Sequence, residues 1–175
     1  MFLLDDIEAL NKAVRLTGDR KLVTFSPVHI KMMELSPFEQ AYFDSLPNWL
    51  YMLEGMAALG YAYTGIKAGR PYCSFGVMKM WPGVAEMWLI PDADLAQVVM
   101  SFHRAARRFS DICMSKLHLV RLQATVHSAN VPGDNWIKRM LFQEEGVLRG
   151  FGPDGSDHKM YSRIKESENV GEDTF

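Results

Sequence analysis

Three apolar runs separated by tight turns dominate the middle of the sequence and constrain the fold more than any other feature. They read AYTGIKAG, YCSFGVMKM and VAEMWLI, and the breaks between them are Gly69-Arg70-Pro71 and Trp81-Pro82-Gly83. Apolar runs of this length, bounded by glycine and proline, are typical of β-strands, and such short connections join antiparallel neighbours. The chain is therefore expected to contain an antiparallel meander over residues 62–90.

Helical patterns lie on both sides of this meander. Residues 93–115 carry the longest apolar stripe, with apolar side chains at three- and four-residue steps. Upstream, the run Ser36-Pro37-Phe38-Glu39 is typical of a capping-box helix start, and the helical region that it opens is broken at Pro47. Shorter helices are expected at residues 5–17 and 132–141.

Further strands complete the pattern. They are expected in residues 21–33, ending near Pro27, in residues 118–127, and as a closing hairpin in residues 142–164 around a Gly-Pro-Asp-Gly turn. The order is strand, helices, three strands, long helix, strand, helix and two strands. It predicts an α+β fold with one central mixed, mostly antiparallel sheet flanked by helices, plus an extra N-terminal helix.

Length and composition limit the domain organisation. The chain has 175 residues, of which 48% are hydrophobic, enough for one core and too few for two ordinary domains. We expect an N-terminal helical extension over residues 1–21, a single domain over residues 22–164, and a mobile acidic tail over residues 165–175.

Charge and cysteine content exclude several classes of function. The net charge is −2, so no basic excess points to nucleic acid, and no apolar run approaches the length of about 18 residues that a membrane span needs. Acidic residues stand where a signal peptide needs positive charge, which favours an intracellular protein. Cys73 and Cys113 have no paired spacing, so we expect two buried free thiols and no metal site.

The last third of the chain resembles the GNAT superfamily of N-acetyltransferases, specifically its ribosomal-protein acetyltransferase branch. In that branch an Asn ends a strand, a short helix follows, and a fixed series of residues leads into a Tyr-Ser strand. The matching positions are Asn130, Phe142, Glu145, Gly146, Val147, Leu148, Arg149, Gly155, Asp157, Tyr161 and Ser162. Upstream of Asn130 the likeness is one of element order alone.

The resemblance implies acetyl-CoA as the cofactor and suggests candidate site residues. GVAEMWLIP resembles the fourth strand of the GNAT fold, where Glu86 would be the general base; apolar neighbours would favour its proton uptake from an amine. His127, at a strand end, is a second catalytic candidate, although strand-end histidines are usually simple hydrogen-bonding residues. The implied cofactor-binding residues are Trp88, Leu89, Ile90 and Asn130.

The cofactor loop departs from the family pattern. The family binds the pyrophosphate of acetyl-CoA with a glycine-rich loop that precedes the long helix, where backbone N–H groups approach the phosphates. Here PDADLAQVV contains no glycine and no basic residue, and Asp92 and Asp94 are expected to cap the helix themselves. The family's general-acid tyrosine is replaced by Ile137, and Tyr161 is expected to pack on the sheet rather than replace it.

A second resemblance concerns small GNAT-like internal virion proteins of short-tailed bacteriophages, on the basis of FSPVH, the glycine-free turn and a Trp-rich strand. It implies a virion-associated assembly or interaction protein without normal catalysis, located in the host cytoplasm and packaged in a virion. The alternative is an active acetyl-CoA-dependent N-acetyltransferase with an atypical loop and Glu86 as base. The missing glycine-rich loop favours the first hypothesis, and the second stays open on the sequence.

Partners of the first hypothesis would be other virion or phage proteins. The N-terminal helix either covers the sheet of its own domain or docks on a second copy in a homo-oligomer. The side chains for docking would be Phe2, Leu3, Ile7, Leu10 and Val14. Trp81, at a Pro-Gly turn, is expected to be exposed and could anchor a protein partner.

Overall fold

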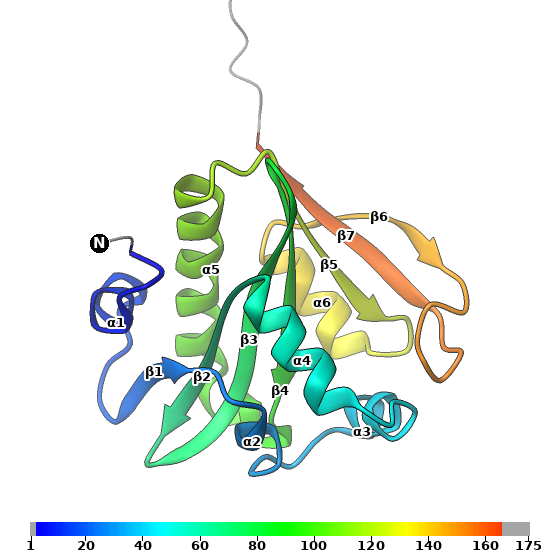
Figure 1. Ribbon diagram of the computed structural model, residues 1–175, viewed down its shortest axis with the longest axis horizontal. Coiled ribbons are helices and arrows are strands. Elements are labelled where there is room, and N and C mark those ends of the chain that lie inside the picture. The colour runs from blue at the N-terminus through cyan, green and yellow to red at the C-terminus, as the bar shows by residue number, and fades with distance from the viewer. Residues whose placement is uncertain (1–2, 166–175) are drawn as a thin grey trace, which may run out of the picture.

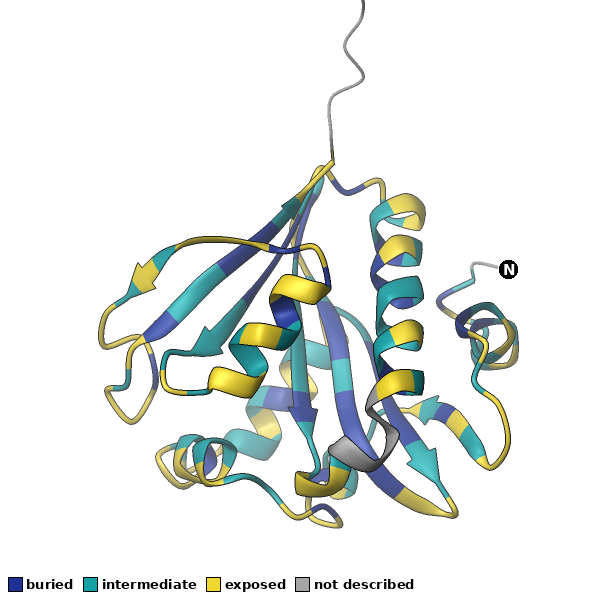
Figure 2. Cartoon of the chain, turned by 180° about the vertical axis from the view of Figure 1, so that it is seen from behind, coloured by how far each residue is buried: buried dark blue, intermediate teal, exposed yellow. Residues whose placement is uncertain are grey.

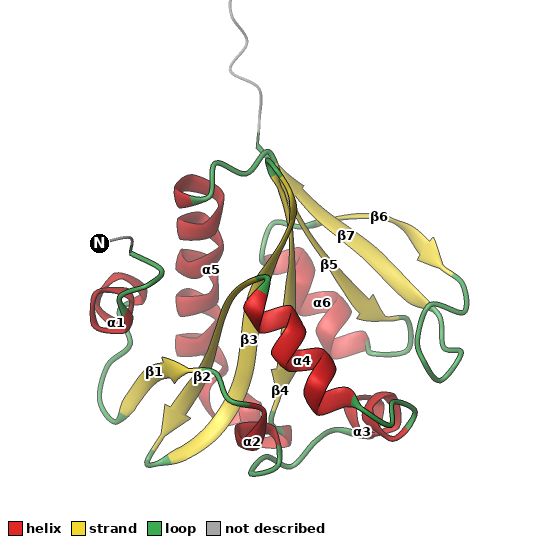
Figure 3. Ribbon diagram, in the orientation of Figure 1, coloured by secondary structure: helices red, strands yellow, loops and turns green. Residues whose placement is uncertain are grey.

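The computed structural model describes residues 3–165, with residues 96–99 described by their backbone alone. Helices pack around one central sheet, as Figures 1 and 3 show. The elements are α1 (Ile7–Val14), β1 (Arg20–Thr24), α2 (Pro27–Ile30), α3 (Pro37–Asp44), α4 (Trp49–Ala58), β2 (Gly60–Lys67), β3 (Arg70–Trp81), β4 (Val84–Pro91), η1 (Ala93–Val98), α5 (Val99–Lys116), β5 (Arg121–His127), α6 (Val131–Arg139), β6 (Gln143–Leu148) and β7 (His158–Ile164).

The seven strands form one mixed sheet in the order β1-β2-β3-β4-β5-β7-β6. Every neighbouring pair is antiparallel except β4 and β5, which are parallel. The predicted meander is confirmed as β2, β3 and β4, and the closing hairpin as β6 and β7. The α+β fold with a mostly antiparallel sheet is therefore confirmed.

The parallel pair β4 and β5 separates soon after it begins. Within the described residues, its register comprises Val84 with Arg121, Ala85 with Leu122, and Glu86 with Gln123. Beyond Glu86 the two strands diverge, as Figure 1 shows toward the C-terminal ends of both arrows. The sheet is thus split on one side, and the last paired residues mark the apex of the split.

Helices cover both faces of the sheet. Helices α2, α3 and α4 lie on one face, over a cluster that includes Ile30, Phe43 and Ile90. Helices α1, α5 and α6 lie on the other face, which Figure 2 shows from behind, over a core that includes Phe109 and Leu122. Because apolar area on both faces is removed from water, the sheet forms the middle of three layers.

The N-terminal helix α1 is part of the protein's own core. Leu10 and Val14 are fully buried in the same cluster as residues from α5 and the sheet. Asn11 pairs with the backbone of Leu22 in both directions, over 2.9 Å and 2.7 Å, and Arg108 Nη1 donates to Val14 O over 3.1 Å. Leu10 and Val14 are therefore not available to a second subunit, and Phe2 lies outside the described residues.

Three element boundaries differ from those expected from the sequence, each for a local reason. Helix α1 ends at Val14 because Arg15 adopts the left-handed conformation (φ 56°), three residues before the expected glycine stop at Gly18. The strand expected over residues 21–33 ends at Thr24, because Pro27 starts α2 after the Ser26 N-cap. The long helix expected from residue 93 begins as the 3₁₀ segment η1 and becomes α-helical only at Val99.

Two further expectations can be compared with the described residues. Cys73 and Cys113 are buried free thiols, and burial raises the pKa of both, that of Cys73 to about 12, so neither is a reactive thiolate. No helix in the described part of the chain is long and apolar enough to cross a membrane.

Candidate functional site

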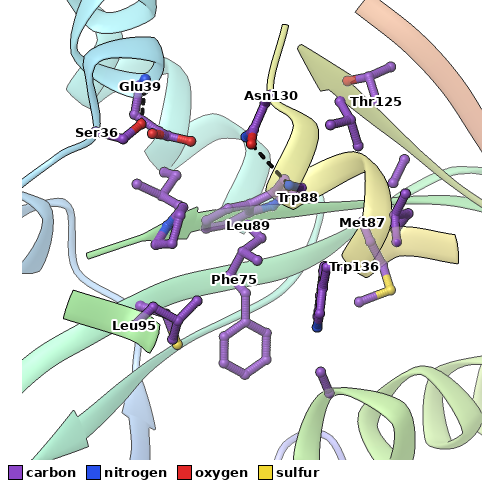
Figure 4. Close-up of a pocket in the computed structure, with 18 of the residues that line it drawn as sticks. Ser36, Glu39, Phe75, Met87, Trp88, Leu89, Leu95, Thr125, Asn130 and Trp136 are labelled. Atoms are coloured by element: carbon purple, nitrogen blue, oxygen red, sulfur yellow. Dashed lines mark hydrogen bonds between the residues drawn. The ribbon is translucent and has the colours of Figure 1, made fainter. Parts of the chain in front are cut away.

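A pocket of about 690 Å³ occupies the split between β4 and β5. Its lining comes from α3 and α4 on one face of the sheet and from α5 and α6 on the other, with the strand ends between them. Figure 4 shows Ser36 and Glu39 at one end of the pocket and Phe75, Leu95 and Trp136 at the other. A volume of this size is typical of a small-molecule site.

All six candidate residues from the sequence border this pocket. They are Glu86, Trp88, Leu89, Ile90, His127 and Asn130. They come together because the C-terminal halves of β4 and β5 diverge side by side and the turn after β5 leads directly into α6. The structure thus places all six residues at one site.

Glu86 lies at the apex of the split and accepts a hydrogen bond from a side-chain amide. Gln123 Nε2 donates to Glu86 Oε2 over 3.0 Å. The amide is oriented by Arg121, whose Nε donates to Gln123 Oε1 over 2.8 Å, and Arg121 in turn makes a bidentate pair with Glu145. Glu86 therefore faces the pocket with a neutral partner and no direct cationic neighbour among these contacts.

His127 is held by local contacts at the end of β5. Its Nδ1 accepts the N–H of Ala129 over 3.1 Å, and its ring lies between Phe38, at 4.8 Å between centroids, and His158, at 5.3 Å. Burial lowers the pKa of His158, which keeps that neighbouring ring neutral at physiological pH. The Nδ1 of His127 thus has a structural partner, as the simple hydrogen-bonding alternative expected.

The residues Trp88, Leu89 and Ile90 form the edge of β4 beyond the apex. Trp88 packs over Gly76, where a Cβ would lie 2.7 Å from its ring, and meets Phe25 edge-on at 5.3 Å. Ile90 is buried beneath α2, α3 and α4, while Leu89 packs on the opposite face. On the β5 side this stretch has no strand partner within the described chain.

Asn130 has a capping role in the structure. Its Oδ1 accepts the N–H of Gly133 over 3.0 Å and so caps the N-terminus of α6. A Cβ at Gly133 would lie 2.9 Å from Asn130 Nδ2, so any other residue there would force the Asn130 side chain to shift and would disturb this cap. One of the two acceptor positions of Oδ1 is therefore used by the helix.

The backbone N–H groups of residues 92 to 95, at the start of the segment that leads into α5, have partners inside the protein. In the order of residues 92, 93, 94 and 95, their acceptors are Tyr72 O, Glu34 O, Asp92 Oδ1 and Asp92 O, at 3.0, 2.7, 2.9 and 3.0 Å. The second oxygen of Asp92 accepts the N–H of Glu34 over 2.9 Å. The expected cap by Asp92 is confirmed. No N–H group of residues 92 to 95 is free to bind a pyrophosphate.

The residues that would supply a proton are also absent from their family positions. Ile137 is buried in α6, and it has no proton to give. Tyr161 is fully buried, and its hydroxyl donates to Asp134 and contacts Glu144. As expected, Tyr161 is a packed strand residue rather than a replacement acid.

Two residues of this site were missed by the sequence reasoning. Glu39 was interpreted as the second half of a capping box, but in the structure only Ser36 caps, accepting the Glu39 N–H over 3.5 Å. The Glu39 carboxylate borders the pocket instead, one turn before Tyr42. The three-residue spacing of Glu39 and Tyr42 on one helix face was the only available signal.

Comparisons with known proteins support the fold alone. No protein-family model matches the sequence, and no curated protein matches it. An acetyltransferase of the GNAT family from Bacillus anthracis matches 85% of this chain and 96% of its own, with a TM-score of 0.63 and 12% identity. A probable acetyltransferase matches 85% and 94%, with a TM-score of 0.66 and 15% identity.

A third similar structure is a complex with coenzyme A. It is RimL, a ribosomal alpha-N-protein acetyltransferase, which matches 86% of this chain and 97% of its own with a TM-score of 0.62 and 13% identity. Identities this low show the architecture alone. The protein thus has the GNAT acetyltransferase fold, as its sequence predicted.

The structure fits one part of acetyl-CoA and does not fit another. The open edge of β4 and the pocket fit the acyl and pantetheine part of acetyl-CoA in size and polarity. Residues 92 to 95 do not fit the pyrophosphate, because their N–H groups are engaged and their exposed side chains include Asp94. Among the described residues, no group of His, Cys, Asp and Glu is arranged to hold a metal ion.

Proposed function

We propose that the protein is an assembly or interaction protein built on the GNAT fold, without acetyl-CoA-dependent catalysis of the normal kind. The observation that carries this proposal is the Asp92 cap. It engages the N–H of Asp94 with one oxygen and the N–H of Glu34 with the other. The protein's own carboxylate thereby engages an N–H group in the segment that corresponds, by the sequence resemblance, to the family's pyrophosphate loop.

Binding acetyl-CoA in the usual way would require this cap to open. Loss of a side-chain N-cap costs about 1 kcal/mol, and the pyrophosphate would then lie beside the carboxylates of Asp92 and Asp94. Repulsion between unit charges about 4 Å apart adds on the order of 1 to 4 kcal/mol, depending on solvent exposure. No Lys or Arg lines the pocket within the described chain to offset that repulsion.

An exposed apolar surface supports interaction with other proteins. Trp81 is 60% exposed, as its place at a Pro-Gly turn predicted, and Val120 and Ile164 are similarly exposed. They are close because Val120 N donates to Gly83 O and Val120 O accepts the N–H of Lys165. Exposed tryptophan beside aliphatic side chains is the composition of an interface anchor.

The proposed partners are other virion proteins, and this part rests on the sequence resemblance to internal virion proteins. A homo-oligomer through the N-terminal segment is part of the same proposal. Since Leu10 and Val14 are buried, it would depend on the outer face of α1 and on residues before it. Localisation in a host cytoplasm and then in a virion follows from the same resemblance.

A second candidate function is supported by a different observation. Glu86 borders the pocket at the point where the β4 edge becomes free of strand pairing. An N-acetyltransferase could use Glu86 as the general base, acting on an amine through water, with β4 backbone groups polarising the thioester. In that case Glu86→Gln would reduce turnover by orders of magnitude without loss of folding.

A thermal-melting experiment with acetyl-CoA tests the proposal. A ligand at about 100 times its dissociation constant adds about 2.7 kcal/mol to stability, which raises Tm by several degrees in a domain of this size. We expect no rise at concentrations that shift an active enzyme of the same fold used as a positive control. A saturable rise with a micromolar midpoint would overturn the proposal and favour the acetyltransferase.

A further inference from the structure

Three exposed apolar side chains gather at one end of the sheet, away from the pocket. They are Trp81, Val120 and Ile164, which are 60%, 56% and 55% exposed. Strand pairing places them in one row, because Trp81 pairs with Val84, Val84 with Arg121, and Arg121 with Ile164. We call Trp81, Val120 and Ile164 together the Trp81 surface.

Backbone hydrogen bonds fix the Trp81 surface in place. Val120 N donates to Gly83 O over 2.8 Å, and Lys165 N donates to Val120 O over 2.9 Å. A Cβ at Gly83 would lie 3.2 Å from Val120 Cγ2, so Val120 packs directly over the turn between β3 and β4. Figure 1 shows this turn, the loop after α5 and the end of β7 meeting at the top of the view. The chain therefore leaves β7 beside the Trp81 surface.

The charge beside this surface is positive. Lys116 ends α5, four residues before Val120, and Lys165 directly follows Ile164; both lysines are exposed. Within residues 3–165, neither lysine has an ion-pair partner. Because like charges repel, this positive rim disfavours the same surface of a second copy and favours an acidic segment as the occupant.

The sequence that follows Lys165 has the complementary chemistry. Residues 166–175 lie outside the described residues and read ESENVGEDTF, with four carboxylates and no Lys or Arg. The apolar residues in this segment are Val170 and Phe175. A phenyl ring among carboxylates suits an exposed tryptophan with a positive rim, since aromatic side chains anchor interfaces and opposite charges steer them.

The length of the segment suits the span of the surface. Trp81 is on β3 and Ile164 is on β7, with β4 and β5 between them. Three strand spacings of about 4.8 Å separate β3 from β7, a span of about 14 Å. Ten extended residues reach up to about 33 Å, which is enough to cross the surface and turn back at Gly171.

We propose that residues 166–175 fold back over the Trp81 surface of their own chain, with Phe175 against Trp81 and Val120 and the carboxylates toward Lys116 and Lys165. A partner protein at the same surface would then have to displace this segment. The contact does not rest on the proposed function, because it needs only this chain. Loss of acetyl-CoA binding or its presence would leave it unchanged.

Fluorine NMR of the 175-residue chain labelled with 5-fluorotryptophan tests the proposal. Each of the four tryptophans gives one resonance, and Trp81→Phe identifies that of Trp81. Phe175→Ser is expected to lower the ratio of covered to uncovered protein at least about 10-fold, because burial of the phenyl ring is lost. The Trp81 resonance should move while that of Trp136, in the core, stays in place. Thr174→Ser is the control within the segment, and a Trp81 resonance that Phe175→Ser leaves unmoved would overturn the proposal.

A charge variant and a dilution series separate the other occupants. Lys116→Glu is expected to lower the same ratio by about 2- to 5-fold, the effect of one exposed ion pair. Lys12→Glu is the matched control, because Lys12 is exposed on α1. Equal effects of the two variants would contradict the charge complementarity. A Trp81 resonance that moves on dilution of the wild type would overturn the assignment to the same chain and indicate a second copy.

Discussion

Gln123 donates a hydrogen bond from Nε2 to Glu86 Oε2 over 3.0 Å, at the last register pair before β4 and β5 separate. The direction of this bond is set by Arg121, which occupies Gln123 Oε1. A chain of polar contacts thus leads from Glu145 on β6 through Arg121 and Gln123 to the apex of the pocket. The apex is held by side chains as well as by the sheet.

Replacing Gln123 by Leu tests that chain. The substitution removes the amide from Glu86 and leaves Arg121 Nε without its acceptor, at a position only 9% exposed. We expect a loss of about 1 to 3 kcal/mol in the free energy of unfolding, measured by urea denaturation. A loss below about 0.5 kcal/mol would show that the network contributes nothing measurable.

Asp92→Ala removes the carboxylate from the Asp94 and Glu34 N–H groups. Chemical denaturation is expected to show destabilisation of about 0.5 to 2 kcal/mol, the usual cost of losing an N-cap. Glu54→Ala, at an exposed carboxylate on α4, serves as the control and should cost less. Equal effects of the two variants would contradict the cap.

Leu10→Ala tests whether α1 belongs to the core. Leu10 is fully buried, so its truncation should cost about 2 to 5 kcal/mol and lower Tm. Leu59→Ala, at a side chain that is 58% exposed, is the matched control and should change stability little. A neutral Leu10→Ala variant would mean that α1 is dispensable to the fold.

Asp134 holds α6 to the closing hairpin. It accepts from the hydroxyl of buried Tyr161 and pairs with Lys159 and Lys138, both at 2.8 Å. Asp134→Asn is expected to lose about 1.5 to 3 kcal/mol of unfolding free energy, the range for hydrogen bonds to a charged group. Lys138→Met, at the more exposed partner, should lose less than Asp134→Asn, because exposed ion pairs contribute little.

The contribution of Glu145 to the free energy of unfolding is expected to depend on pH in the acid range. Hydrogen bonds from Arg121 and then Ser162 lower the pKa of Glu145 to about 2, from an ordinary value of 4.5. Its folded-state pKa is depressed, so its contribution is fully present above pH 4.5 and is lost as the pH falls toward 2. Glu145→Gln should flatten that part of the stability curve and leave the neutral region parallel to that of the wild type.

The sheet and its connections were predictable because their signals are local. Apolar runs bounded by Gly69 and by the Pro82-Gly83 turn specify strands and tight turns within a few residues. The GNAT resemblance then named Glu86 and His127 as candidate site residues, and both border one pocket in the structure. The capping role of Asp92 was also predictable, because an aspartate before a helix accepts hydrogen bonds from the nearest backbone N–H groups.

Other features could not be predicted from the sequence, because they depend on contacts between distant segments. Glu39 has the spacing of a capping box, yet its carboxylate borders a pocket that requires β4, α5 and α6 to exist. The hydrogen bond between Gln123 and Glu86 joins two residues that lie 37 positions apart in the chain. The sequence left two alternatives open for Leu10 and Val14, and only packing against α5 and the sheet decided between them.

The sequence by itself determined the strand meander, the helix start after Ser36 and the loss of the glycine-rich loop, because each depends on residues within about one helical turn of one another. Tertiary structure decided the 3₁₀ start before α5, the burial of α1 and the negative, partly uncompensated lining of the pocket. Burial and charge compensation depend on which distant side chains meet, and the fold alone settles that.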